Sequence, residues 1–288
     1  MRGIGQLGLD LSRHLDDGAG QVHRSRPLGG HSMASATVRA MDLGIAGKRA
    51  AVAAASGGLG FCSAQALAQE GVRVAICGRD ADRIEDAAAR IGHGCIPLVC
   101  DVGDAAGGRA FIAAATEALG GIDILVANGG GPPAGNFAST SVDSYSEALD
   151  LNLLSVVGMC KAAVPAMQAQ GWGRVVAITS LAVRQPMANL ILSNTARAGV
   201  TGFLKTVARE VAGDGVTINT VQPGLHATDR VTALYGSVPD AKALAIPTGT
   251  IGDPGDFGAI VAFLCSDQAK FTTGLQYHVD GGSYAALL

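Results

Sequence analysis

A glycine-rich segment between an apolar run and a helical pattern is the part of this sequence best suited to bind a phosphate. Residues 54–60 read Ala-Ala-Ser-Gly-Gly-Leu-Gly. Glycines let backbone N–H groups approach an anion closely, and the positive end of a helix dipole stabilises negative charge there. The residues expected to contact a dinucleotide pyrophosphate are Ser56, Gly58, Leu59 and Gly60. A tight turn without a ligand is the alternative.

A second group with cofactor chemistry closes the next apolar run, where Gly78 is followed by Arg79. An acid at this strand end would hydrogen-bond the ribose 2′-OH of NAD, whereas a nearby arginine can pair with the 2′-phosphate of NADP. Because Gly78 stands in the acid's position, the sequence favours NADP over NAD. The alternative is a solvated Arg79 whose partner is Asp80 or Asp82.

Short apolar runs alternate with helical patterns from Lys48 onward, and these elements must position the groups above. The predicted strands are 50–55, 72–77, 95–100, 122–127, 174–179, 216–221 and 275–279, and the firmest helix is 193–211. The alternation predicts an α/β protein: a single-domain Rossmann fold over residues 47–288, with a doubly wound, mostly parallel seven-stranded sheet and helices on both faces. Residues 1–46 lack such periodicity and are interpreted as a flexible N-terminal tail.

Composition limits the classes of partner. The net charge is -3 without a sustained basic block, so we expect neither nucleic acid nor an anionic membrane surface as partner. No apolar run approaches the roughly 18 residues of a membrane span, which favours a cytoplasmic protein. The six cysteines form no CxxC pair and are predicted to be reduced, buried thiols, so no metal site is expected.

From about residue 48 to 283 the chain resembles the short-chain dehydrogenase/reductase family, and most closely its 3-oxoacyl-acyl carrier protein reductase-like members. The matching segments occur in the family's order: the turn resembles TGxxxGxG with Ala54 at the first glycine, Asp101-Val102 resembles the pair that contacts adenine, Asn128-Gly129-Gly130 resembles NAG, and Pro223-Gly224 with Thr228 resembles PGxxxT on the nicotinamide side. The resemblance implies that these residues bind the cofactor. It also places His226 near the nicotinamide amide, the alternative being a solvent-facing loop histidine.

The resemblance also implies a set of four catalytic positions, and this sequence departs from the family at two of them. Ser180 and Asn152 match the family's serine and asparagine, but its tyrosine and lysine positions hold Ser193 and Arg197. Hydride transfer to a carbonyl requires a proton, and general acid catalysis contributes roughly 10²- to 10⁴-fold in rate. A serine cannot be tuned as a tyrosine can, and an arginine stays protonated, although Arg197 can still donate to the cofactor ribose. For Ser193 a helix N-cap is the alternative, and for Ser180 and Asn152 a structural role.

The leading functional hypothesis is an NADP(H)-dependent oxidoreductase acting on a small carbonyl, enone or imine, with Ser180 polarising the substrate and Asn152 holding a water. The alternative is a catalytically silent NADP-binding redox sensor or partner subunit. The family resemblance also predicts a homodimer or homotetramer that assembles through helices at about 144–169 and 193–213.

Overall fold

One parallel sheet organises the part of the chain that the computed structural model describes, residues 41–287. Its strands are β1 (Arg49–Val52), β2 (Arg73–Gly78), β3 (Ile96–Val99), β4 (Ile124–Ala127), β5 (Gly173–Ile178), β6 (Val216–Pro223) and β7 (Gln276–Val279). They lie in the order β3-β2-β1-β4-β5-β6-β7, and every neighbouring pair is parallel. The predicted doubly wound α/β fold is confirmed.

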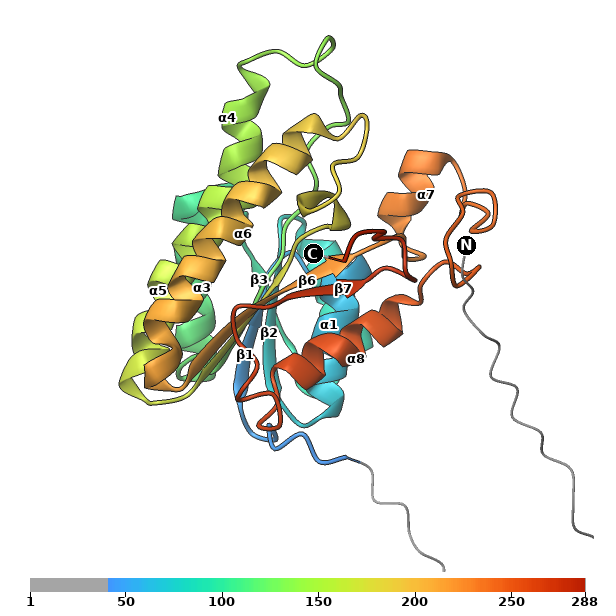
Figure 1. Cartoon of the computed structure of the whole chain (residues 1–288). Helices are drawn as coiled ribbons and strands as arrows, with labels where there is room; N and C mark the ends of the chain where they lie inside the picture. The colour runs from blue at the N-terminus through green and yellow to red at the C-terminus, as the bar shows by residue number, and fades with distance from the viewer. Residues whose placement is uncertain (1–40, 288) are drawn as a thin grey trace, which may run out of the picture. The chain divides into compact units, whose positions relative to one another are not determined.

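Helices cover both faces of this sheet (Figure 1). One face carries α1 (Gly58–Gln69), α2 (Ala81–Ile91) and α8 (Pro254–Leu264), and the other carries α3 (Ala105–Leu119), α5 (Ser155–Ala169) and α6 (Ile191–Val211). The shorter elements are α4 (Ser144–Leu149), a π-helix η1 (Asp150–Leu154), α7 (Asp229–Tyr235) and the 3₁₀ turns η2 (Leu181–Val183) and η3 (Ala212–Asp214). Because the sheet is parallel, all seven strands point their carboxyl ends toward the same edge.

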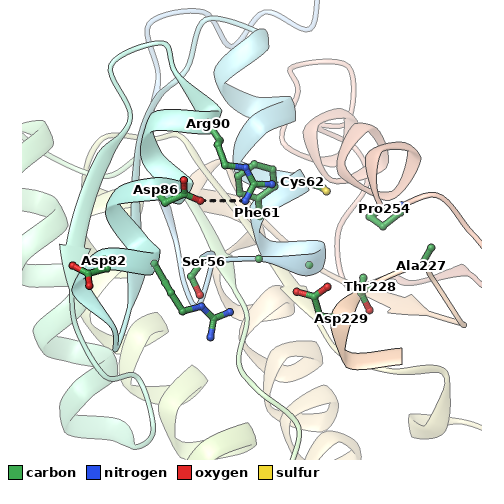
Figure 2. Close-up of a pocket in the computed structure, with 13 residues that line it drawn as sticks. Ser56, Phe61, Cys62, Asp82, Asp86, Arg90, Ala227, Thr228, Asp229 and Pro254 are labelled. Atoms are coloured by element: carbon green, nitrogen blue, oxygen red, sulfur yellow. Dashed lines mark hydrogen bonds and ion pairs between the residues drawn. The ribbon is translucent and has the colours of Figure 1, made fainter. Parts of the chain in front are cut away.

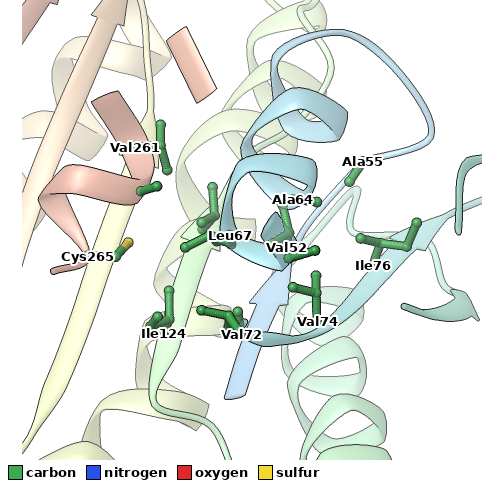
Figure 3. Close-up of a cluster of buried hydrophobic side chains, with 14 of the residues drawn as sticks. Val52, Ala55, Ala64, Leu67, Val72, Val74, Ile76, Ile124, Val261 and Cys265 are labelled. Carbon is green, nitrogen blue, oxygen red and sulfur yellow. The ribbon is translucent and has the colours of Figure 1, made fainter. Parts of the chain in front are cut away.

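The sheet lies between two aliphatic cores, because successive side chains of each strand point to opposite faces. Val52, Ile76 and Ile124 pack toward α1 and α8, as Figure 3 shows around Leu67. Their neighbours Ala51, Ala75 and Leu125 pack on the other face. Burying an aliphatic side chain of this size stabilises the fold by about 1.5–3 kcal/mol. A sheet buried on both faces therefore provides a rigid base for the loops at its carboxyl edge.

The start of the domain lies earlier than the sequence predicted. Residues 1–40 of the proposed tail are outside the described part, but Leu43 and Ile45, also assigned to that tail, are buried in the core. The compact unit begins at Asp42, so the boundary at residue 47 was wrong by a few residues. Two isolated apolar residues are too few to show periodicity in a sequence.

The long apolar helical stretch at 144–169 also differs from the prediction. Its 26 residues are long and apolar enough to cross a membrane by length and composition alone, but half of its most apolar window is buried inside the domain, as in a core helix. The stretch is not one regular helix, because η1 separates α4 from α5. Gly158 of α5 lies so close to α3 that a Cβ there would be 2.3 Å from the Ala105 carbonyl oxygen.

Candidate active site

The glycine turn after β1 is built so that its backbone must stay bare. A Cβ on Gly60 would lie 2.6 Å from Nδ2 of Asn128 and 2.9 Å from the carbonyl oxygen of Ala54. The Asn128 amide donates hydrogen bonds to the carbonyls of Ala53 (3.3 Å) and Ala54 (3.1 Å), which ties the end of β4 to the turn. The turn then leads directly into α1, whose first residue is Gly58. This is the arrangement that binds a dinucleotide phosphate.

Ala54, at the position of the family's first glycine, has a backbone conformation that alanine rarely adopts, with φ at 48°. For a residue with a Cβ the left-handed region costs roughly 1–2 kcal/mol, more than the roughly 0.5–1 kcal/mol of backbone entropy that glycine loses. We therefore predict that Ala54→Gly stabilises the protein by about 0.5–1 kcal/mol and leaves NADPH affinity at least as high, measured by urea unfolding and fluorescence titration.

Ala55→Gly is the matched control for this prediction, because Ala55 lies in the same turn, is fully buried, and has no positive φ. It is expected to lose about 0.5–1 kcal/mol. Equal destabilisation by the two substitutions would show that residue 54 is not strained.

A pocket of about 550 Å³ opens beside the turn. It is lined by Ser56, Gly57, Gly58, Phe61, Cys62, Asp82, Arg83, Asp86, Arg90, Ala227, Thr228, Asp229 and Pro254, most of which Figure 2 labels. Thr228 approaches the turn, since a Cβ on Gly58 would lie 3.8 Å from its methyl group. The structure thus brings the predicted residues Ser56, Gly58 and Thr228 together. Ser180, Asn152, Ser193 and Arg197 do not line this pocket.

The end of β2 is tightly packed around Gly78. A Cβ on Gly78 would lie 3.3 Å from Ile84 Cδ1 and 3.4 Å from Ser56 Cβ. Arg79 is exposed, and within residues 41–287 it forms no ion pair. Arg79 is thus solvated, as the alternative has it, but within the same residues it is paired with neither Asp80 nor Asp82. Asp80 caps α2 by accepting a hydrogen bond from the Arg83 backbone N–H at 2.9 Å.

Two arginines of α2 that the sequence analysis missed also line the pocket. Arg83 and Arg90 were not separable from an ordinary solvated helix face in the sequence. The Arg90 guanidinium lies 4.6 Å from the centre of the Phe61 ring and 3.4 Å from a carboxylate oxygen of Asp86 (Figure 2). The pocket wall therefore carries two guanidinium groups, besides the carboxylates of Asp82, Asp86 and Asp229.

The other predicted cofactor contacts lie at the same carboxyl edge. Val102 is buried after β3, while Asp101 is exposed and accepts a hydrogen bond from the Gly103 N–H. Gly224 follows Pro223, the last residue of β6, and a Cβ there would lie 2.7 Å from the Cα of Asp280. Thr228 caps α7 by accepting from the Val231 N–H.

His226 is buried, so the alternative of a solvent-facing loop histidine is wrong. Only 4% of its surface is exposed, and its ring packs edge-on against Phe257, 5.2 Å between ring centres. Burial lowers the pKa of His226, against the opposing effects of the Gly224 carbonyl and two aspartates. The side chain is therefore neutral at pH 7 and packed in the core, which does not favour a role as proton donor.

Asn152 lies in the π-helix η1, a local widening that frequently marks functional sites. Its amide Nδ2 donates to the Gly130 carbonyl at 2.8 Å, so the loop after β4 is fixed against this helix. Its Oδ1 is buried and has no hydrogen-bond partner among the described residues. A buried acceptor without a donor is costly, so this atom is suited to accept from a water or a ligand.

Ser180 follows β5 and begins η2. Its Oγ accepts a hydrogen bond from the Ala182 N–H at 3.1 Å, which leaves the hydroxyl proton free to be donated. The structural role and the role in substrate binding are thus compatible. Ser193 is buried inside α6, whose N-cap position is Leu190, so the alternative of a Ser193 N-cap is wrong.

Arg197 lies one turn after Ser193 on α6 and is only 8% exposed. Its Nη1 donates to the carbonyl of Ile178, two residues before Ser180, at 3.0 Å. Burial, together with the nearby charge of Arg230, lowers the pKa of Arg197 to about 10. The guanidinium remains protonated at neutral pH and cannot serve as a base there.

The parallel sheet and the bare glycine turn before α1 define a nucleotide-binding α/β protein of the Rossmann class. A family model described as enoyl-(acyl carrier protein) reductase matches residues 53–284. The reductase FabG of Vibrio cholerae, a 3-oxoacyl-[acyl-carrier-protein] reductase, is 35% identical over 242 residues, which cover 84% of this chain and 99% of that protein. The chain belongs to the short-chain dehydrogenase/reductase family and is an oxidoreductase of that type.

Two solved structures show the same fold. L-sorbose reductase from Gluconobacter frateurii, complexed with NADPH and L-sorbose, is 28% identical with a TM-score of 0.79, over 86% of this chain and 100% of that one. A short chain oxidoreductase from Pseudomonas aeruginosa PAO1, bound to NADPH and containing an atypical catalytic center, is 30% identical with a TM-score of 0.78, over 83% and 97%.

Proposed function

We propose that this protein is an NADP(H)-dependent oxidoreductase that transfers hydride between the cofactor and a small carbonyl, enone or imine. The single observation that carries the proposal is the Gly60 cradle, which a methyl group would fill. When bound there, NADPH supplies the hydride. The solved relatives that contain NADPH support this choice of cofactor.

The chain's own residues then have distinct roles in the proposed reaction. The backbone of the turn at 54–60 holds the pyrophosphate, and Arg79 pairs with the 2′-phosphate. The hydroxyl of Ser180 donates a hydrogen bond to the substrate's oxygen or nitrogen. The orphan Oδ1 of Asn152 holds a water, which supplies the proton that the reduced substrate takes up. Arg197 presents a fixed positive charge and does not deliver a proton.

The test of this function has two stages. Nicotinamide fluorescence first measures NADPH and NADH binding, and NADPH consumption is then followed with a panel of ketones, enones and imines. Binding with turnover supports the enzyme. Binding without turnover of any panel member would favour the catalytically silent alternative, and failure to bind either cofactor would exclude both.

Arg79→Gln is predicted to weaken NADPH binding about tenfold while leaving NADH affinity unchanged, since a hydrogen bond to a charged group contributes roughly 1.5–3 kcal/mol. Arg109→Gln, which removes an exposed arginine from α3, is the control and should change neither affinity. Equal binding of NADPH and NADH by the unaltered protein would contradict the preference for NADP.

A further inference from the structure

Arg197 is a buried cation without a carboxylate partner. Among the described residues its guanidinium donates one hydrogen bond, to a neutral backbone oxygen, that of Ile178, the last residue of β5. Nowhere in residues 41–287 does a carboxylate form an ion pair with it. A guanidinium has five N–H donors, and a buried charge is destabilising unless it is paired. The remaining donors of Arg197 are therefore suited to an anion that enters the site.

A second arginine lies at the carboxyl end of the neighbouring strand. Arg230 of α7 reaches across to the loop that follows β4, where its Nη2 donates to the Pro132 carbonyl at 3.2 Å. Its guanidinium covers Gly131, because a Cβ there would lie 2.9 Å from the same Nη2. Among the described residues Arg230 also forms no ion pair.

The sheet brings these two cations to the same place. β4 and β5 are adjacent and parallel, so their carboxyl ends, where Arg230 and Arg197 are anchored, lie side by side. The positive charge of Arg230 repels that of Arg197 and lowers the pKa of Arg197. Ser180 follows β5 and Asn152 contacts the loop after β4, so the two like charges are at the proposed reaction site. A negative charge between them would relieve their repulsion.

The cofactor does not supply that charge at this position in the proposed complex. Its phosphates belong at the glycine turn and at Arg79, whereas the nicotinamide ribose is neutral and the oxidised nicotinamide ring is itself cationic. The anion must therefore come with the substrate. Carboxylate and phosphate groups both match the planar, forked donors of a guanidinium, and we take the carboxylate because it is the smaller of the two.

We propose that the substrate is an oxo acid, or the imine of one, whose carboxylate is bound by Arg197 and Arg230 while its carbonyl faces Ser180. This inference rests on the proposed function and specifies its substrate class. The carboxylate orients the carbonyl and shields the two positive charges from each other.

Binding of benzoate and of its neutral analogue benzamide tests the proposal. Calorimetry is carried out on the protein saturated with NADPH. We expect benzoate to bind at least about tenfold more tightly than benzamide. Arg230→Gln should lower benzoate affinity about tenfold and leave benzamide affinity unchanged. Arg209→Gln, which removes an exposed arginine from the last turn of α6, is the matched control and should change neither.

Two results would overturn the inference. One is equal binding of benzoate and benzamide. The other is an Arg230→Gln variant that binds NADPH more weakly but benzoate as before, because the anion would then be a phosphate of the nucleotide. If NADPH itself does not bind, the proposed function fails, and the same comparison on the free protein still decides whether the arginine pair holds a carboxylate.

Discussion

The Gly60→Ala variant is expected to bind NADPH at least about 100-fold more weakly than the unaltered protein, a loss of about 2.7 kcal/mol. The new methyl group would lie 2.6 Å from the Asn128 amide and 2.9 Å from the Ala54 carbonyl, and the latter is backbone that cannot rotate away. Either the turn opens or Asn128 releases the two carbonyls that it holds. Both responses move the N–H groups that we propose face the pyrophosphate. Fluorescence titration with NADPH measures the loss.

Gly202→Ala is the control outside the binding site. No atom lies within 4 Å of a Cβ built on Gly202, which is an exposed residue of α6. This variant should bind NADPH nearly as well as the unaltered protein. Thermal unfolding of both variants separates a loss of binding from a loss of fold, since overpacking costs typically 1–3 kcal/mol of stability. A folded Gly60→Ala protein with unchanged affinity would show that the nucleotide binds elsewhere.

The fold could be predicted from the sequence because its strands are buried on both faces. Runs such as Ile124–Ala127 are continuously apolar, and each predicted strand overlaps an observed one. The glycine turn at 54–60 and helix α6 were predicted from local patterns in the same way. The features that were missed depend on partners distant in sequence. The burial of His226 depends on Phe257, which belongs to α8. The break between α4 and α5 at the π-helix lies just before the part of α5 that packs against α3.

The candidate site was predictable in its residue types but not in its electrostatics. The glycine turn and Asn128 meet as expected because both lie at the carboxyl edge of adjacent strands. The sequence could not show that Arg197 would be buried without a carboxylate, because its neighbours come from β5 and α7. Nor could it show the positive φ of Ala54, since an alanine at a glycine position is compatible with either an adjusted turn or a strained one.

Combining Ser193→Tyr with Arg197→Lys is expected to raise kcat for reduction of a 3-oxoacyl thioester by about 10²- to 10⁴-fold, the usual contribution of a general acid. α6 holds the two positions one turn apart, so the new phenol and ammonium would share a helix face. The ammonium stabilises the phenolate, which lowers the tyrosine pKa from its ordinary value of about 10 toward neutrality. NADPH consumption at saturating cofactor measures the change.

The variant Ser193→Phe with Arg197→Lys separates the effect of the phenolic proton from the effect of the aromatic ring. It adds a similar aromatic volume to the buried position 193 without a hydroxyl. It should show no comparable gain while binding NADPH. The two variants should also differ in pH profile, since the tyrosine variant must lose reductase activity as the phenol deprotonates at high pH, and the phenylalanine variant has no such group. If both gain equally, the effect comes from volume or from the lysine. If the tyrosine variant binds NADPH without any gain, Ser180 and Asn152 do not hold a carbonyl where position 193 can protonate it.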